Sequence, residues 1–474
     1  MSAPLAENPL ASDPRGTPPP GSWAPLRRIA RLTLRPLEKF LRIQAASGII
    51  LLIATAVALI WANSPWVDSY HALFDLPVGI RFGAFSFERP LEWVVNDGLM
   101  AIFFFVVGME IRREIDHGEL SELRRAALPL ACALGGMVAP AALYLSIAHT
   151  PAAQPGWGAP MATDIAFALG ILALLGNRVP AALRVLLLAL AVIDDLGAIV
   201  VIAIFYSSGI SLVGVAIAAG GVAVVLVFKV FGVRNKLAYV VPGIVVWAGV
   251  YAAGVHPTIA GVIVGMMTPV TAWRGPEGFL RDASDAMARL TPRAGGLLPH
   301  ELHAHLNTIE VARREAISPA ESLIEGLHPW VAFGIMPVFA LANAGVELGD
   351  LSIEGDGLLV ALGTTVGLLL GKPLGVLLAG GIAVKTGIAT LPKGLSARHM
   401  LVLGVVAGIG FTMALFIASL AFEESHMLGA AKLGVMIASG LAMIVGLALG
   451  RALLPICDPE SASTADEAEA STEL

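Results

Sequence analysis

Residues 186–206 read LLLALAVIDDLGAIVVIAIFY, an apolar run interrupted only by two adjacent acids, Asp194 and Asp195. About twenty helical residues cross the hydrocarbon core of a bilayer, so this run predicts a transmembrane helix with both acids near its middle. A charged side chain at that depth costs about 3 kcal/mol on insertion scales and usually serves a function. Asp164 and Lys372 add a third acid and a base within apolar segments. The set favours a chain that handles ions or protons.

Further apolar runs along the chain predict an all-α polytopic membrane protein with about twelve transmembrane helices. Hydrophobic residues make up 57% of the chain and charged residues only 14%, against about 25% charged in a soluble domain. The seventh and eighth runs are short and poorly separated, so the count could be off by one. The expected spans are residues 45–63, 90–109, 126–148, 157–176, 181–206, 210–231, 237–251, 254–270, 329–348, 358–384, 399–422 and 428–454.

The distribution of Lys and Arg predicts the orientation of these spans. The loops after spans three, five, seven, nine and eleven contain neither residue, whereas the loops after spans two, four, six, eight and ten and the segment before span one all carry Lys or Arg. Because positively charged loops stay in the cytoplasm, both termini are expected there. The first apolar run begins only near Ala45, too late for a cleavable signal peptide.

Three regions are therefore expected along the chain. Residues 1–44 form a cytoplasmic N-terminal tail with an amphipathic helix, residues 45–454 a transmembrane domain, and residues 455–474 a disordered acidic tail. The long cytoplasmic loop 271–318 is either a solvated connector or a regulatory segment. Between the first two spans, PVGIRFGAFSFERP alternates apolar and polar residues around Gly83, which predicts a small outer β-hairpin; an irregular loop is the alternative.

Two spans carry signals of an interruption inside the membrane. Asp164 follows the Pro- and Gly-rich sequence QPGWGAP in span four, and Gly408, Gly410 and Thr412 punctuate span eleven. Interrupted helices far apart in sequence point to a transporter site between inverted repeats. Half-helices that meet there would present opposed dipole ends, which Asp164 and Lys372 could neutralise.

The oxygen-rich composition of this region suits a hard cation such as Na+. Carboxylates, a threonine hydroxyl and backbone carbonyls are the ligands that such cations prefer. A proton competes with the cation for the same oxygens, and the adjacent aspartates should titrate as a coupled pair. This competition produces exchange if the site opens to each face of the membrane in turn.

Six blocks of the sequence resemble the bacterial sodium/proton antiporter NhaA family. They are ATDIAFALGILALLG, ALAVIDDLGAIVVIAIFY, GVHPTIAGVIVG, LHPWVAFGIMPVFALANAGV, LLGKPLGV and GIGFTMALFIASLAF. The resemblance covers about residues 37–454. It implies that Asp195 and Asp194 bind Na+ and carry the proton, that Asp164 and Lys372 flank two crossed discontinuous helices (spans four and eleven), and that Thr163 lines the site.

The resemblance also carries expectations about the whole protein. It implies a homodimer linked through the outer hairpin, in the inner membrane of a bacterium and in contact with its lipid. The implied activity is electrogenic exchange of Na+ (or Li+) for H+, activated at alkaline pH, with no cofactor and no nucleic-acid partner.

A second group of residues is expected near the cytoplasmic mouth. Glu110, Arg113 and Glu114 in GMEIRREIDHGEL match the family's inner funnel and pH response, although a solvated helix end would explain them equally well. His256 in GVHPTIAG could titrate near neutral pH, but a lone histidine near a span end is more often structural.

The chain also departs from the family pattern. Loop 271–318 and both tails are longer, and an acid of span nine is displaced by one position to Glu325, with Ile324 in its place. A pH-sensing role for this loop is therefore in question.

Three other interpretations of the paired aspartates remain. They could be a structural acid pair, or the dyad of an intramembrane aspartyl protease. Adjacent residues on one helix point about 100° apart, unlike a dyad built from two helices, and no GxGD motif accompanies them. A passive cation channel is the third; a buried lysine and interrupted helices argue against it. A transporter rather than an enzyme is therefore expected.

Overall fold

The computed structural model describes residues 46–83, 85–207, 209–233, 235–272, 275–289, 299–349 and 354–455. The predicted N-terminal tail (1–44) and all but the first residue of the predicted acidic tail (455–474) lie outside these ranges. The described part is mostly helical, with one small two-stranded sheet.

Eight helices of the described part are long and apolar enough to cross a membrane. Two bent pairs add up to two more: the helix Ala46–Ala62 with α2 (Val67–Phe74), bent by 117°, and α17 (Ala397–Ala407) with α18 (Phe411–Ala421), bent by 45°. Lys236–Ala252 and Thr258–Met267 are apolar but shorter. The chain is thus a multi-pass membrane protein, and the count of twelve spans stays a prediction.

The long helices, several of which contain more than one element, have these bounds. They are α3 (Leu91–Trp93), η1 (Val94–Leu99) and α4 (Met100–His117); α5 (Leu123–Ile147); η2 (Gln154–Met161) and α6 (Ile165–Leu174); α7 (Ala181–Phe205); α8 (Leu212–Val230); α13 (Pro319–Trp330), η5 (Val331–Ile335) and α14 (Met336–Asn343); α15 (Asp356–Val366), η6 (Gly367–Gly371) and α16 (Lys372–Lys385); and α19 (Ser425–Leu453). The shorter elements are η3 (Gly176–Arg178), η4 (Lys236–Tyr239), α9 (Val240–Ala252), α10 (Thr258–Met267), α11 (Gly275–Arg289) and α12 (Pro299–Ala316).

The ninth predicted span begins earlier than expected, at Pro319 instead of residue 329. Hydropathy placed the boundary where the apolar run starts, but the helix starts at its capping signal. The Ser318 hydroxyl accepts a hydrogen bond from the amide of Glu321 at 3.1 Å, and Pro319 occupies the first helical position. The helix therefore extends about three turns beyond the apolar run.

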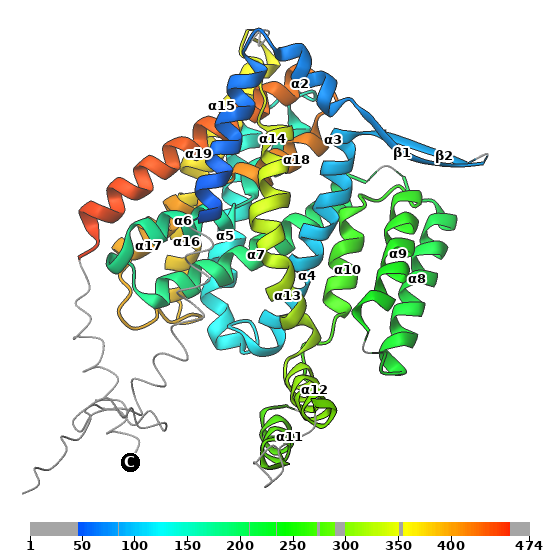
Figure 1. Ribbon diagram of the computed structural model, residues 1–474. Helices are drawn as coiled ribbons and strands as arrows, with labels where there is room; N and C mark the ends of the chain where they lie inside the picture. Colours follow the sequence, from blue (N-terminus) through cyan, green and yellow to red (C-terminus); the bar gives the residue numbers. More distant parts are fainter. Residues whose placement is uncertain are drawn as a thin grey trace, which may run out of the picture.

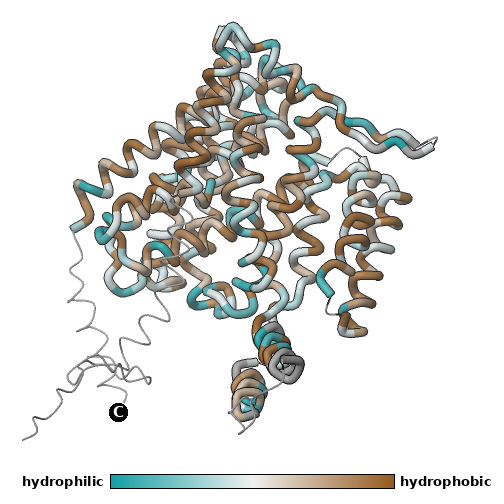
Figure 2. Tube along the Cα trace, viewed as in Figure 1, coloured by the Kyte–Doolittle hydropathy of each residue, from teal (hydrophilic) through white to brown (hydrophobic). Residues whose placement is uncertain are grey.

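Helices α4 with α10, α5 with α16, α8 with α9, and α15 with α19 form the main packed pairs. In Figure 1 they make a bundle, with α11 and α12 packed on each other beyond its lower end. Hydrophobic residues fill the middle of the bundle, and hydrophilic residues gather at its ends (Figure 2).

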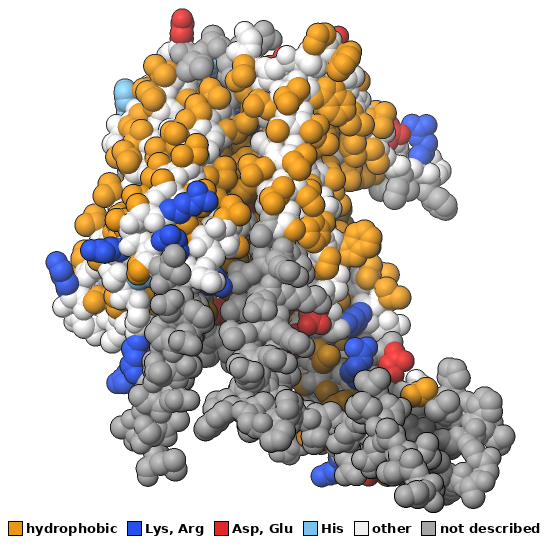
Figure 3. Space-filling model, turned by 60° about the vertical axis from the view of Figure 1, so that its left-hand side comes forward, with side chains coloured by type: hydrophobic (Ala, Val, Ile, Leu, Met, Phe, Trp, Pro, Cys, Tyr) orange, Lys and Arg blue, Asp and Glu red, His pale blue; other side chains and the backbone are white. Residues whose placement is uncertain are grey.

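Lys and Arg side chains gather on the lower part of the surface in Figure 3. We call this the basic end; the helix ends and connections that carry Lys and Arg are the end of α4 (Arg112, Arg113), the start of α5 (Arg124, Arg125), η3 (Arg178), the end of α16 (Lys385) and the start of α17 (Arg398).

Strands β1 (Pro77–Phe82) and β2 (Phe85–Pro90) pair antiparallel where the sequence predicts a hairpin. Gly83, between them, has φ +60°, a left-handed conformation that glycine adopts without strain. The pair projects from the end of the bundle opposite the basic end (Figure 1). Phe87 of β2 contacts Trp93 and Tyr251 edge-on, with ring centroids 5.6 and 6.3 Å apart, which fixes the base of the sheet to α3 and α9.

Candidate functional site

Two interruptions of helical structure meet inside the bundle. The backbone is extended between η2 and α6, and it leaves the helix again between α17 and α18. The amide of Asp164 in the first break donates to the carbonyl of Ile409 in the second at 2.7 Å. A Cβ on Gly410 would lie only 3.0 Å from the Ala162 carbonyl, so a residue without a side chain fits this close approach.

Asp164 lies at the N-terminal ends of two half-helices at once. Its carboxylate accepts from the amide of Phe167 in α6 at 3.1 Å and from the amide of Thr412 in α18 at 3.2 Å. The Thr412 hydroxyl donates to the same carboxylate. Both helix ends carry unsatisfied amides and positive dipole charge, which an acid at this position satisfies.

Lys372 joins one of the paired aspartates to the end of η2. Its ammonium donates to Asp194 Oδ2 at 2.5 Å and to the carbonyl of Met161. Met161 is the last residue of η2, where carbonyls lack helical partners. The lysine thus balances a carboxylate and a negative helix end together.

Thr163 connects Asp194 to the second break. Its hydroxyl lies 2.6 Å from Asp194 Oδ2 and 3.0 Å from the carbonyl of Ala407, the last residue of α17, and shares its single proton between these two acceptors. The other carboxylate oxygen of Asp194, Oδ1, is buried and has no hydrogen-bond partner among the described residues. One oxygen of Asp194 is therefore fully engaged, and the other is free to bind a ligand.

Asp195 differs from its neighbour. Its side chain makes no hydrogen bond or ion pair with any residue that the structure describes. It lies within electrostatic range of Asp194, Asp164, Lys372 and Glu110. Asp194 is 1% exposed, Asp195 2%, Asp164 1% and Lys372 0%, so the whole group is shielded from bulk water. Buried carboxylates without partners are expensive, which marks Asp195 as a position for a cation or a proton.

The three residues predicted at the cytoplasmic mouth have different environments. Glu110 lies in α4 within electrostatic range of Asp195 and has no hydrogen bond or ion pair with a described residue. Glu114, one turn later, accepts from the amide of Glu119 at 2.7 Å and so ties down the chain after α4. Arg113 is exposed on the same helix. Of these, Glu110 is the residue whose charge reaches the paired aspartates.

His256 belongs to a separate buried cluster. Its Nε2 lies 3.1 Å from Asp97 Oδ1, and its Nδ1 lies 2.8 Å from the Thr258 hydroxyl. The imidazole also packs edge-on against Phe416, with centroids 5.3 Å apart. Phe416 lies on α18, about one turn after Thr412, so this histidine contacts the same half-helix that Asp164 caps.

Sequence reasoning named the acids, Thr163 and Lys372, and the structure brings Thr163, Asp194 and Lys372 into contact, but several backbone partners were missed. The carbonyls of Met161, Ala407 and Ile409 all take part, and nothing in their side chains signals this. Thr412 was noted only as an interruption; a threonine directly after the Gly-rich break could have been recognised as a capping partner for an acid. The Ser439 hydroxyl from α19, which accepts from the amide of Phe411 at 3.1 Å, was also missed.

The assembled groups are carboxylate, hydroxyl and carbonyl oxygens with one ammonium. Such oxygens coordinate hard cations. No group of three or more His, Cys, Asp or Glu side chains suited to a resident metal lies among the described residues. The carboxylates can also hold protons. Chemically, the site can exchange a small hard cation for a proton at the same oxygens.

Comparison with known proteins agrees with this chemistry. Residues 38–449 match the family model described as Na+/H+ antiporter 1. This chain belongs to the Na+/H+ antiporter 1 family. Family members of high identity include the Na(+)/H(+) antiporter NhaA 2 of Myxococcus xanthus, 63% identical over 96% of this chain and 97% of the relative. The Na(+)/H(+) antiporter NhaA 2 of Sorangium cellulosum is 57% identical over 96% and 98%. The NhaA 2 of Pseudomonas putida is 49% identical over 90% and 94%.

Membership in this antiporter family rests on the whole membrane part of the chain. The matched region starts before the helix Ala46–Ala62 and ends within α19, so it contains both breaks, the paired aspartates and Lys372. These relatives are named as transporters, in agreement with the expectation that the chain is not an enzyme.

Proposed function

We propose that the chain is a secondary transporter that exchanges cytoplasmic Na+ (or Li+) for external H+ by alternating access. The exchange is electrogenic and depends on pH, and it serves sodium and pH homeostasis at the bacterial inner membrane. The observation that carries this proposal is the buried carboxyl of Asp195, which adjoins Asp194 in the chain; neither it nor Asp194 Oδ1 has a hydrogen-bond partner within the part of the chain that the structure describes.

In this proposal the two aspartates supply the cation-binding oxygens. Na+ binds at the Asp195 carboxylate and Asp194 Oδ1, while Lys372 and Thr163 hold Asp194 Oδ2 in place. A proton that arrives at these oxygens removes the charge that holds Na+, and Na+ removes the proton in return. Binding of one ion therefore excludes the other, which is the requirement for coupled exchange.

The two breaks supply the movable part. Asp164 joins the ends of α6 and α18 through three hydrogen bonds, so these half-helices are expected to shift together against α7. We propose that they are the crossed discontinuous helices of two inverted repeats.

In the same proposal, Glu110 lies on the route from the basic end and attracts cations to Asp195 from that side, with Arg113 and Glu114 at the mouth. His256 acts on α18 from the Asp97 side.

We further propose that the basic end faces the cytoplasm, with both termini on that side and twelve spans once Lys236–Ala252 and Thr258–Met267 are included. Strands β1 and β2 then lie outside, where the exposed edge of a two-stranded sheet can pair with that of a second copy. The chain would form a homodimer in this way. Light scattering on the detergent-solubilised protein tests this, since a protein mass of one chain would refute it.

Replacement of Asp195 by Asn tests the proposed function. The change keeps the shape of the side chain but removes the charge and the titrating group, so Na+-driven proton movement should fall to background. The measurement is the fluorescence of a pH-sensitive dye in proteoliposomes after addition of Na+. The matched control is Asp68→Asn, an exposed acid on α2, which should exchange like the unaltered protein. Full exchange by Asp195→Asn in a folded protein would refute the assignment.

A further inference from the structure

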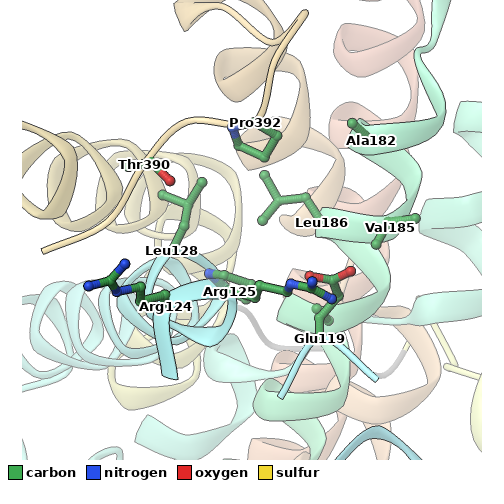
Figure 4. Close-up of a pocket in the computed structure, with 11 residues that line it drawn as sticks. Glu119, Arg124, Arg125, Leu128, Ala182, Val185, Leu186, Thr390 and Pro392 are labelled. Atoms are coloured by element: carbon green, nitrogen blue, oxygen red, sulfur yellow. The ribbon is translucent and has the colours of Figure 1, made fainter. Parts of the chain in front are cut away.

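A cavity of about 460 Å³ lies where α5 and α7 begin (Figure 4), and neither of the paired aspartates lines it. Its wall comes from the start of α5, the start of α7 and the segment between α16 and α17. Apolar side chains form most of it: Leu128 and Pro129 of α5; Ala182, Val185, Leu186 and Ala189 of α7; and Pro392. Glu119, Arg124, Arg125 and Thr390 complete the lining. The volume is in the range of ligand-binding pockets.

The charged groups of this pocket leave one cation available. Arg125 is accompanied by acids: its Nε lies 3.2 Å from Glu122, and in Figure 4 it points toward Glu119. Arg124 extends in the opposite direction and has no hydrogen bond or ion pair with any residue that the structure describes. It lies in the first turn of α5, where backbone amides and the helix dipole also favour an anion.

The pocket does not suit the transported cation. Two arginines at its rim repel Na+, and the apolar wall offers it few oxygen ligands. Arg124 favours an anion instead. The guanidinium of Arg124 is a planar fork that can bind two phosphate oxygens at once.

The apolar wall of the pocket indicates that the bound anionic group belongs to a molecule with an apolar part. From Ala182 to Ala189 the α7 side of the pocket extends about 10 Å along the helix, so it reaches well past the charged rim. Val185 in that wall is 37% exposed, and Leu130 and Leu134 further along α5 are 43% and 50% exposed. Exposed apolar side chains on apolar helices of this length suit contact with the hydrocarbon of a bilayer. A free anion gains nothing from such a wall, whereas a phospholipid fills both parts.

We propose that this pocket binds the headgroup of an anionic phospholipid, with the phosphate at Arg124 and the glycerol and upper acyl chain along Val185 and Leu186. Basic pockets between transmembrane helices accept anionic lipid headgroups in membrane proteins generally. The site is separate from the exchange site, and it does not depend on the proposed function.

The test is lipid binding by the purified, delipidated protein in detergent, measured by native mass spectrometry with added phosphatidylglycerol or phosphatidylcholine. We expect phosphatidylglycerol to bind more tightly. Arg124→Gln should lower its affinity about fivefold, the effect of one interfacial cation, while Arg124→Lys, which keeps the charge but loses the fork, should lower it by less. Ala182→Trp, which fills the pocket without a change of charge, should also lower it. The matched control is Arg398→Gln, an exposed arginine at the same end but outside the pocket.

Each remaining outcome overturns the proposal. Equal affinity in Arg124→Gln and the unaltered protein would mean that the phosphate lies elsewhere. Equal affinity in Ala182→Trp would mean that lipid contacts surface arginines only. Displacement of phosphatidylglycerol by millimolar inorganic phosphate would identify a site for a soluble anion. The elution volume in size-exclusion chromatography and the melting temperature check that each variant is folded. None of these measurements requires exchange activity.

Discussion

Lys372 is completely buried, and its ammonium has two acceptors, Asp194 Oδ2 and the Met161 carbonyl. At the residue scale, this one ammonium nitrogen sets the net charge of the site. If the ammonium is removed, Asp194 faces the low-dielectric interior without its counter-charge, and the end of η2 loses its donor. Arg124 at the basic end, by contrast, is exposed, so its loss should leave the fold intact.

Lys372→Ala should therefore destabilise the protein and weaken exchange. Loss of one partner of a buried ion pair costs about 3–5 kcal/mol in soluble proteins, which predicts a clear drop in melting temperature. Lys372→Arg keeps the charge and should retain partial activity. Lys385→Ala, at the exposed end of the same helix, is the matched control. An unchanged melting temperature and Na+ affinity in Lys372→Ala would make the lysine a bystander.

At the scale of elements, the position of α16 depends on its contact with α5. A Cβ on Gly375 would overlap the backbone carbonyl of Gly135, and a Cβ on Gly135 would overlap that of Gly375. The two helices therefore approach backbone to backbone, as small residues allow in membranes. This contact lies one turn from Lys372 and fixes the height of its ammonium against Asp194.

Gly375→Ala should push α16 away from α5. Overpacking of this kind costs about 1–3 kcal/mol, so we expect a lower melting temperature together with a higher Km for Na+. Gly381→Ala on the same helix is the control, because a Cβ there meets nothing within 4 Å. The idea fails if both variants melt and transport alike.

Element boundaries and breaks could be predicted from the sequence to different degrees. The two broken helices were predictable because Gly408, Gly410 and the Pro-rich QPGWGAP cannot continue a regular helix in an apolar segment. The π-helical turns η5 and η6 were not. Each lies just before a proline, Pro337 or Pro373, whose ring would clash with a carbonyl in a regular helix. The wider turn resolves this clash, but apolar periodicity does not reveal it.

The site itself shows a similar limit. The identities of Asp164, Asp194, Asp195 and Lys372 follow from the rarity of charges in apolar runs. Their partners do not, since the rotation of each helix decides that Asp194 meets Lys372 while Asp195 meets no described group. The meeting of Asp164 with Ile409 also depends on tertiary packing across the whole chain.

At the scale of the whole molecule, competition between H+ and Na+ predicts the pH response. Once protons occupy the carboxyls, each further unit of acidification should raise the apparent Km for Na+ about tenfold, by mass action alone. We expect this trend in initial rates from pH 6 to 9. A flat Km with a changing maximum rate would contradict simple competition and favour a separate conformational sensor.

Glu110→Gln refines the same measurement. Removal of this charge should shift the dependence of the apparent Km for Na+ on pH. The shift should shrink at high salt to the extent that solvent reaches Glu110, because exposed charges are screened within about 8 Å at physiological ionic strength. Glu122→Gln, which removes an exposed acid at the start of α5, serves as the control.

The long sequence separations within the site also bear on how the protein is made. Asp194 lies 178 residues ahead of its lysine, and Asp164 lies 248 residues ahead of Thr412. Ribosomes add about 5–20 residues per second, so these acids wait about 10–50 s in a nascent chain before their partners exist. During that interval the first half of the protein holds uncompensated acids within or beside the membrane. A chain cut short before Lys372 cannot complete the site and would be recognisable to quality control as unfinished.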